Sequence, residues 1–298
     1  YIAAFYERAG YVRLPDGSTG SVTIGGTVSP AGGNFEEPVT QATLKVVGAF
    51  HGLSRERSDA RKYPAIDPQI SWSKYRSVVD ADKLKYLKTI LLRGAEVGTM
   101  MKVVGEEGTS LSDYVLYLKS EMLDAVYLQQ NSFDLVEANC SKERQRYVTD
   151  KLVKILGSDY NVKDKDQARV FINRLRQRFI NWNYKEYECD DFNKLEAEIK
   201  RLAKEVMPAY VSDLCWLVST DENGKRYLSI FNNDGNERDL KKGNILHREA
   251  DTRVTISFKD KTTPHVLKEA LGSCSLERID DNTFAATIPA AGFAIIGF

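Results

Sequence analysis

The sequence predicts a multidomain chain in which a partial α/β layer, an all-α helical bundle and a small all-β sandwich follow one another. Three observations lead to this prediction. Within residues 1–78, a β-branched run is followed by a glycine-rich loop and a helical run. Apolar residues then recur at helical spacing over residues 79–207. Over residues 210–298, short β-branched and aromatic runs alternate with turn dipeptides.

The composition is that of a globular chain. Its 298 residues suit one large domain or two ordinary ones. The 42 basic and 42 acidic residues cancel, so no net charge draws the chain to nucleic acid or to an anionic bilayer. No apolar run reaches about 18 residues, and we therefore expect no direct membrane insertion.

The cysteines and histidines are scattered and show no Cys-x-x-Cys spacing, so we expect no metal site built from them. Isolated thiols suit a reducing compartment such as the cytoplasm. The four cysteines are Cys140, Cys189, Cys215 and Cys274.

In the first block we expect a helix from Ile2 that ends at Gly10, a strand over residues 21–29 interrupted by Gly25 and Gly26, and a helix over residues 40–53. The first of these helices has neither a cap nor a lead-in. We therefore expect the chain to be truncated upstream.

The second block predicts an antiparallel helical bundle. Ser110 and Asp113 are spaced as a capping box at the start of one helix. Residues 105–110, Gly-Glu-Glu-Gly-Thr-Ser, form an exposed acidic hinge between two helices. Four apolar stripes define the helices: Leu84, Leu87 and Leu91; Val115, Leu118 and Met122; Phe171, Leu175, Phe179 and Trp182; Leu195, Ile199, Leu202 and Val206.

The third block predicts the β-sandwich, with a domain boundary between residues 205 and 212. Residues 221–226, Asp-Glu-Asn-Gly-Lys-Arg, carry a strong hairpin signal, and further Asp-Gly and Asp-Asn turns separate the other short runs.

Three aromatic residues are candidates for binding a flat ligand. Tyr63 lies between a basic turn and the Pro-x-x-x-Pro corner at Pro64 and Pro68, and Tyr127 and Phe133 lie six positions apart near a helix end. Aromatic rings provide the flat apolar walls that an adenine ring needs. The alternative, that all three are ordinary core or hinge aromatics, is the one that spacing alone favours.

For the other candidate motifs, the sequence pattern favours a structural role over a catalytic or binding one. The loop after the first strand lacks the Gly-x-x-x-x-Gly-Lys-Ser/Thr pattern, which occurs nowhere in the chain. The mixed charges of residues 54–62 are typical of a solvated face. His51 has no evident nucleophile partner, and no carboxylate pair in the third block is marked as a glycosidase acid and base.

Several longer motifs carry a resemblance to a known family. They are FYERAG, GSVTIGGTVSPAGGNFEEPVTQATLKVVGAFHGLSRERSDARKYPAIDP, SWSKY, YLQQNSFD and NWNYKEY. On these motifs, residues 1 to about 207 resemble the C-terminal part of the catalytic alpha chain of V-type and archaeal-type rotary ATPases. The remaining residues loosely resemble the C-terminal β-sandwich of some carbohydrate-active enzymes, a match from which no residue role is transferred.

The resemblance implies three parts and a function. Residues 1–78 would be the distal part of a RecA-like nucleotide-binding domain, residues 79–207 the C-terminal helical bundle, and residues 210–298 a β-sandwich tail. The family binds ATP or ADP with Mg²⁺ and couples ATP hydrolysis or synthesis to proton or sodium translocation. Its partners are B subunits in an alternating hexamer and a central stalk subunit, on the cytoplasmic side and peripheral to the membrane.

The resemblance also implies residue roles. Tyr63 would pack against adenine, Tyr127 and Phe133 would close the same pocket, and the hinge at residues 103–113 would face the rotating stalk. The family's phosphate-binding loop and catalytic glutamate are not found, so we expect no ATP hydrolysis by this chain alone. Two alternatives remain open, a noncatalytic assembly or interaction fragment and a carbohydrate-related accessory β domain in a chimeric chain.

Overall fold

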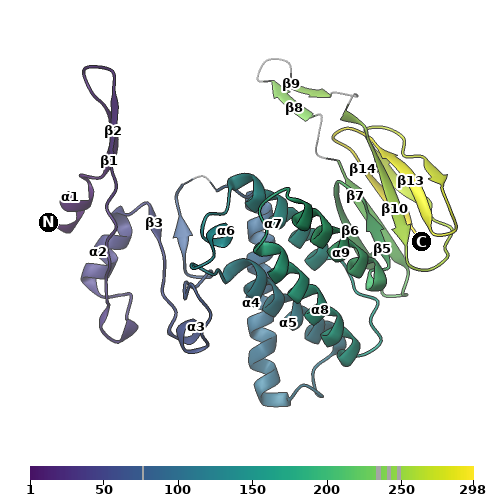
Figure 1. Ribbon diagram of the computed structural model, residues 1–298, viewed down its shortest axis with the longest axis horizontal. Helices are drawn as coiled ribbons and strands as arrows, with labels where there is room; N and C mark the ends of the chain where they lie inside the picture. Colours follow the sequence, from purple (N-terminus) through teal and green to yellow (C-terminus); the bar gives the residue numbers. More distant parts are fainter. Residues whose placement is uncertain (76, 233–235, 240–242, 247–249) are drawn as a thin grey trace. The chain divides into compact units, whose positions relative to one another are not determined.

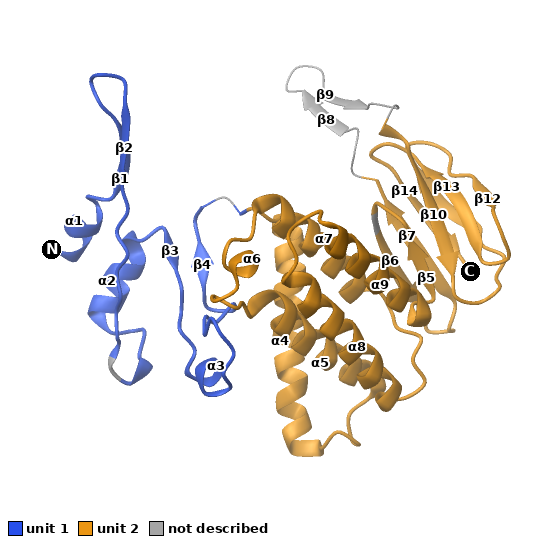
Figure 2. Cartoon of the chain, in the orientation of Figure 1, with its two compact units in different colours: residues 1–77 blue, residues 78–298 orange. Residues whose placement is uncertain are grey.

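The computed structural model describes residues 1–75, 77–232, 236–239, 243–246 and 250–298 (Figure 1). The chain divides into two compact units, residues 1–77 and residues 78–298, which are coloured separately in Figure 2. Among the described residues, no helix combines the length and the apolar character needed to cross a bilayer.

The first unit is built from short elements. Two of its strands form an antiparallel hairpin, β1 with β2, and two more pair as β3 with β4. The elements are α1 (Ile2–Tyr6), β1 (Gly10–Arg13), β2 (Thr19–Val22), the 3-10 turn η1 (Ala31–Gly33), α2 (Pro38–Val46), β3 (Ala49–Phe50), α3 (Arg55–Asp59) and β4 (Trp72–Ser73).

Three expectations for this unit are corrected. The helix expected from Ile2 to Gly10 is α1, which ends at Tyr6, because Gly10 already pairs with Val22 as the first residue of β1. The strand expected over residues 21–29 ends at Val22, where the pairing of β2 with β1 also ends. The helix expected over residues 40–53 is α2, which begins earlier because Pro38 occupies its first turn and the Glu37 side chain accepts from the Thr40 amide. It ends at Val46, because Val47 is extended and the chain then enters β3.

The helical character expected for residues 79–207 is confirmed. Side chains that accept a backbone hydrogen bond cap the long helices, with Asp80, Ser110, Ser141 and Asp164 before α4, α5, α7 and α8. The helices are α4 (Ala81–Val104), α5 (Leu111–Leu123), the π-helical turn η2 (Asp124–Leu128), α6 (Leu135–Ala138), α7 (Lys142–Gly157), α8 (Lys165–Asn183) and α9 (Asp190–Val206).

Helices α4 and α5 form a close hairpin. Gly94 lies so near α5 that a Cβ there would collide with Ser120, and a Cβ at Gly98 would lie 3.2 Å from the Tyr117 ring. Their connection turns at Gly105, whose φ of 77° favours glycine. The predicted cap is also present, since Ser110 Oγ accepts from the Asp113 amide at 3.1 Å and donates to its carboxylate at 2.7 Å.

The predicted apolar stripes differ in burial. In α8 the stripe is buried throughout, and in α9 only Leu195 is half-buried. In α4, Leu84 and Leu91 are half-buried, and the residues that face the core are Leu87, Ile90, Gly94 and Val97. The difference arises because α4 packs mainly along one partner, α5, whereas α8 lies between other helices.

An aromatic cluster joins α7, α8 and α9. Trp182 stacks on Phe192 with ring centroids 4.5 Å apart, and its indole N–H donates to the Phe192 carbonyl at 3.0 Å. Tyr147 of α7 lies against both rings. Arg144 donates to the Asn183 carbonyl at the end of α8, and Asn183 in turn donates to the Val126 carbonyl in η2 at 2.6 Å.

Two four-stranded antiparallel sheets follow the helices, with strand orders β12-β13-β10-β5 and β11-β14-β7-β6. The strands are β5 (Ala209–Val211), β6 (Cys215–Thr220), β7 (Arg226–Phe231), β10 (Thr252–Phe258), β11 (His265–Ala270), β12 (Leu276–Arg278), β13 (Thr283–Ile288) and β14 (Phe293–Gly297), and a separate pair is β8 (Asn236–Asp239) with β9 (Gly243–Leu246). The hairpin expected at residues 221–226 joins β6 to β7. The Asp-Gly turn expected at residues 234–235 lies outside the described residues.

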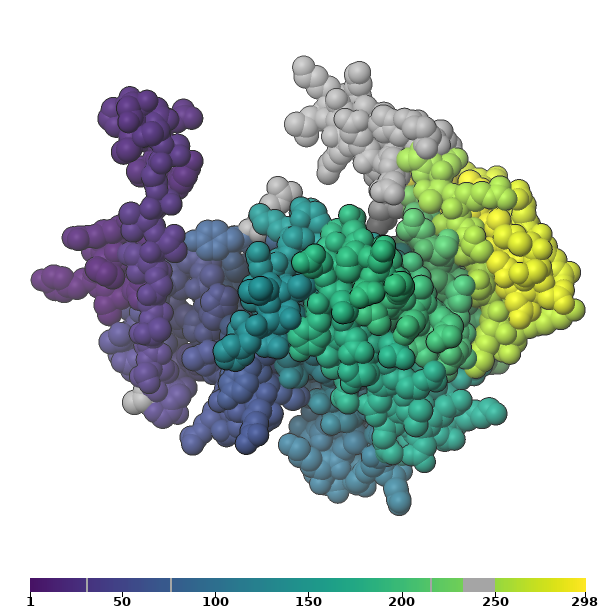
Figure 3. Space-filling view, in the orientation of Figure 1, coloured from purple at the N-terminus to yellow at the C-terminus, as the bar shows by residue number. Residues whose placement is uncertain are grey.

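The helices and the two sheets share one hydrophobic core, which runs from Leu87 in α4 to Ile296 in β14. Met207, which follows α9 and is 1% exposed, lies where the helices meet β5. The two parts abut without a break in Figure 3. The domain boundary placed between residues 205 and 212 stays a prediction from the sequence.

A polar cluster lies at the same junction. The Glu196 carboxylate of α9 accepts from Tyr147 at 2.7 Å and pairs with Lys151 at 3.0 Å and Lys200 at 2.7 Å. Burial alone would raise the pKa of Glu196, but these three partners together hold that pKa below its usual range. Burial beside Glu196 also raises the pKa of Tyr210 in β5 to about 12.

The shared core predicts that the helices and sheets unfold together. We expect Met207→Ala to lower the free energy of unfolding of residues 78–298 by about 2–5 kcal/mol, because it leaves a cavity at the junction. Hydrogen exchange in increasing denaturant, read by mass spectrometry, should show equal shifts in the α8 and β7 amides. The matched control is Leu267→Ala, at a side chain that is half exposed. A shift confined to either set of amides would contradict a shared folding unit.

Candidate functional site

The loop that carries Tyr63 is pinned at its base and open at its tip. The Ser54 amide donates to the Ala65 carbonyl and the Asp67 amide donates to the Gly52 carbonyl, both at 2.8 Å. The peptide bond before Pro64 is cis. The Tyr63 side chain is 54% exposed, so a flat ligand can reach its ring.

Tyr127 has a different environment. It lies in η2, is half-buried against the hydrophobic core, and its hydroxyl accepts from the Thr149 hydroxyl of α7 at 2.9 Å. Thr149 is fully buried. The Tyr127 hydroxyl is therefore held inside the helical part of the second unit.

Phe133 lies on the segment that follows and is 97% exposed. Its amide donates to the Asn131 side chain at 3.0 Å. The buried Glu137 fixes this segment, because its carboxylate accepts from the Asn131 amide at 2.7 Å and its carbonyl accepts from the Gln130 side chain at 2.8 Å. The ring therefore projects from a tied loop and has a free face.

The three aromatic candidates are divided between the two units. Tyr127 and Phe133 belong to one segment of the second unit, and no ring contact between them occurs in the part of the chain that is described. Tyr63 belongs to the first unit. Their joint pocket stays a prediction.

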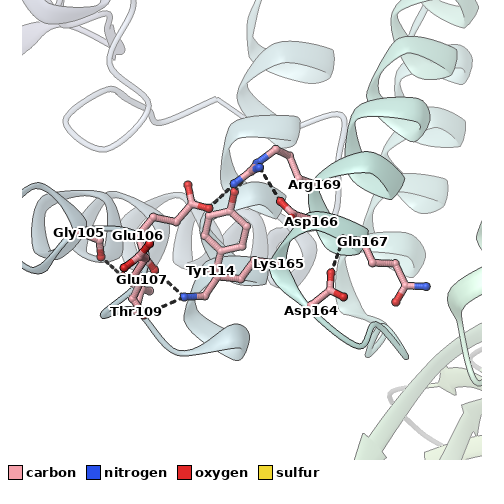
Figure 4. A network of polar contacts seen from close by, with 10 residues as sticks. All are labelled: Gly105, Glu106, Glu107, Thr109, Tyr114, Asp164, Lys165, Asp166, Gln167 and Arg169. Carbon is pink, nitrogen blue, oxygen red and sulfur yellow. Dashed lines mark hydrogen bonds and ion pairs between the residues drawn. The ribbon is translucent and has the colours of Figure 1, made fainter.

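The acidic turn, residues 105–110, is held by the first turns of α8 (Figure 4). Arg169 donates to the Glu106 carboxylate, to the Tyr114 hydroxyl at 2.8 Å and to Asp166 at 2.9 Å. Lys165 donates to the carbonyls of Glu106 at 2.6 Å and Glu107 at 3.2 Å. The turn is exposed, as expected, except for the buried Thr109, and its shape is set by these contacts.

Sequence reasoning missed Lys165 and Arg169, which lie about 60 positions from their partners. One local signal was available. Cations in the first turns of a helix oppose its dipole, and such an arrangement indicates an anionic or carbonyl partner elsewhere in the chain. The hydrogen bond that Arg169 donates to the Tyr114 hydroxyl, followed by the nearby carboxylates, raises the pKa of Arg169 above its ordinary value.

No group of three or more His, Cys, Asp or Glu side chains that could hold a metal ion occurs in the described ranges. Carboxylates in the acidic turn are instead paired with α8 or exposed. The arrangement as a whole offers an accessible ring at Tyr63, another at Phe133, and a stiff acidic projection at residues 105–110.

Comparisons with known proteins define the class. Residues 1–73 match the nucleotide-binding domain of the ATP synthase alpha/beta family, and residues 81–154 match the C-terminal domain of V and A type ATP synthase. The chain thus resembles, in order, part of a nucleotide-binding domain and part of a C-terminal domain of ATP synthases.

Matches to individual proteins identify a more specific class than the family models do. A V-type ATP synthase alpha chain from Treponema denticola is 64% identical over 201 residues, which are 67% of this chain and 34% of the relative. One from Borrelia turicatae is 61% identical over 203 residues, which are 68% of this chain and 35% of the relative. These matches confirm the resemblance to V-type ATP synthase alpha chains that the motifs predicted.

The chain spans about a third of the length of these relatives. Among solved structures, the ATP synthase subunit NeqB from Nanoarcheaum equitans is 22% identical, with a TM-score of 0.43 over 52% of this chain and 38% of that chain. That structural likeness is too low to establish a shared fold.

The contacts of Arg169 lead to a prediction about the acidic turn. We expect Arg169→Met to change the free energy of unfolding by less than about 1 kcal/mol, because the ion pairs are partly solvated. Exchange of the Thr109 amide, which closes the turn onto the Glu106 carbonyl, should accelerate roughly tenfold in native-state hydrogen exchange. Arg201→Met, at an exposed position on α9, is the control. Equal exchange in both variants would show that Arg169 does not hold the turn.

Proposed function

We propose that this chain contributes to the catalytic subunit of a rotary V/A-type ATPase, which couples ATP hydrolysis or synthesis to proton or sodium translocation. The observation that carries the proposal is the identity of 61–64% to V-type ATP synthase alpha chains over two thirds of the chain. The order of the two matched domains supports it.

Residues 1–78 are proposed as the distal part of a RecA-like nucleotide-binding domain. In this proposal Tyr63 stacks on the adenine of ATP or ADP, and Tyr127 and Phe133 close the same pocket. The exposure of Tyr63 supports the first role, and the open face of Phe133 supports the second. The hydrogen bond with Thr149 fixes the hydroxyl of Tyr127. Part of the half-buried Tyr127 side chain stays accessible and would contact the adenine.

Mg²⁺ would accompany the nucleotide phosphates. The sequence contains no Gly-x-x-x-x-Gly-Lys-Ser/Thr loop, and phosphoryl transfer depends on positioning by such a loop and its lysine. We therefore assign adenine binding, and no catalytic step, to the residues of this chain.

The hinge at residues 103–113, which contains the acidic turn, is the proposed contact with the central stalk. B subunits would flank the chain in an alternating hexamer on the cytoplasmic side of the membrane. Arg169 and Lys165 support a mechanical role for the turn, because they connect it to α8 by side-chain and backbone contacts. A force applied to the turn would then be transmitted to α8 as well as to α4 and α5.

A noncatalytic assembly role is the second candidate, and one observation favours it over a separate carbohydrate-related module. The two sheets share their core with the helices, so residues 210–298 are built into the helical part and are not attached to it by a free linker. Such an arrangement suits docking of the whole unit on neighbouring subunits.

The adenine assignment predicts an effect of Tyr63 on nucleotide affinity. The test uses the Treponema denticola relative with its matched segment replaced by that of this chain. We expect Tyr63→Ala to weaken ADP binding by about 1–3 kcal/mol, roughly 5- to 150-fold in Kd, because a stacking ring is lost. Isothermal titration calorimetry measures the change.

Tyr63→Phe should keep the affinity within about twofold, because the ring remains. Tyr11→Ala, which removes another exposed tyrosine ring, from β1, is the matched control. An unchanged Kd in Tyr63→Ala would refute the adenine assignment.

A further inference from the structure

A cavity of ≈ 600 Å³ lies in the second unit, and its lining includes none of Tyr63, Tyr127, Phe133 and the acidic turn. Its walls come from α4, α5, the end of α7 with the segment after it, and the end of β6. The volume falls in the range of small-molecule sites in proteins, roughly 300–1,000 Å³. The cavity therefore lies where the helices meet the sheets.

Lys119 of α5 is one of its lining residues and is only 9% exposed. Its ammonium donates to the Ser158 carbonyl at 2.7 Å and lies 4.3 Å from the centre of the Tyr160 ring. An ammonium carries three N–H donors, so this contact leaves further donors for a ligand. A buried ammonium group with unused N–H donors favours the binding of an anion.

The other charged residues that line the cavity are Arg93 and Asp159, both exposed at its edge. The Asp159 carboxylate accepts from the Thr220 hydroxyl of β6 at 3.5 Å. Two cations against one carboxylate leave a net positive charge. The site therefore favours a monoanion over a cation or a neutral ligand.

Much of the remaining lining is apolar. Ile90 and Leu156 are buried, and Leu116 is half-buried beside them. An inorganic anion would leave these side chains without a partner, whereas a ligand with a hydrocarbon body would cover them. The apolar walls thus indicate that the part of the ligand that lies away from its anionic group is a hydrocarbon.

We propose that this cavity binds a small organic carboxylate, whose carboxylate group is held by Lys119 and Arg93 and whose apolar body packs on Ile90, Leu116 and Leu156. The site is independent of nucleotide binding at Tyr63. Because the ligand would touch α4, α5 and the end of α7, it would also stabilise the packing of these three helices.

The site should bind its ligand more weakly at high pH. Burial lowers the pKa of Lys119 to about 8, while the Asp159 charge opposes that shift. The other titratable groups facing the cavity are Tyr86, Arg93, Asp159 and Tyr160, and burial raises the pKa of both tyrosines, away from neutral pH. Loss of the Lys119 proton above pH 8 removes the charge that attracts the carboxylate.

The test uses the full chain and 4-fluorobenzoate as the probe, with neutral 4-fluorobenzamide as its matched analogue. Fluorine NMR titration at pH 7 should show saturable binding of the benzoate and at least about tenfold weaker binding of the amide. Affinity for the benzoate should fall at least about threefold between pH 7 and pH 9, and affinity for the amide should not change.

Two variants locate the site. Lys119→Met should weaken benzoate binding about tenfold or more, and Arg93→Gln should weaken it about threefold, because the arginine lies at the edge. Lys85→Met, at an exposed position on α4, should bind as the unchanged chain does. If Lys119→Met does not fold, Arg93→Gln and the pH dependence decide. The proposal fails if benzoate and benzamide bind equally, if neither binds, or if affinity is unchanged in the site variants.

Discussion

The stacking of Trp182 on Phe192 is the contact on which the arrangement of the second unit depends. It joins the end of α8 to the start of α9, and the indole N–H bonded to the Phe192 carbonyl fixes the two helices in register. Around this pair, Arg144 and Asn183 connect the end of α8 to α7 and to η2. The position of α9 then sets where β5 begins, because only Met207 and Pro208 separate the two elements. The aromatic pair thus positions both the segment that carries Phe133 and the edge of one sheet.

Within the second unit, the features assigned to function are exposed but anchored. Phe133 and the acidic turn are exposed, yet each is tied to a buried or well-anchored group, Glu137 in one case and the first turns of α8 in the other. Each feature is thus accessible and also has a defined geometry. A fixed geometry lowers the conformational entropy that the chain would lose on binding a ligand or a partner. Tyr63 follows the same pattern within the first unit, on a loop closed by backbone hydrogen bonds.

Much of the fold could be predicted because its signals are local. The stripe from Phe171 to Trp182 and the Asn-Gly turn before β7 depend on neighbours within a few residues. The end of α2 at Val46 could not, because it depends on the pairing of β3 with the distant β4. The support of the acidic turn was missed for the same reason, since Arg169 and Glu106 lie 63 positions apart. For Tyr63, the long motifs supplied a role that its spacing did not, and the structure adds only that its ring is accessible.

The close approaches at Gly94 and Gly98 have a mechanical consequence. From Gly98 to the end of α4 at Val104 the helix continues for about 9 Å, at roughly 1.5 Å per residue, beyond the second close approach to α5. A rotation of about 6° at Gly98 would move the tip by about 1 Å. The contacts from Lys165 and Arg169 brace the free end. The hairpin of α4 and α5 is therefore held both along its length and at its tip. A sideways force on the tip would be transmitted to α8 and would not simply bend α4.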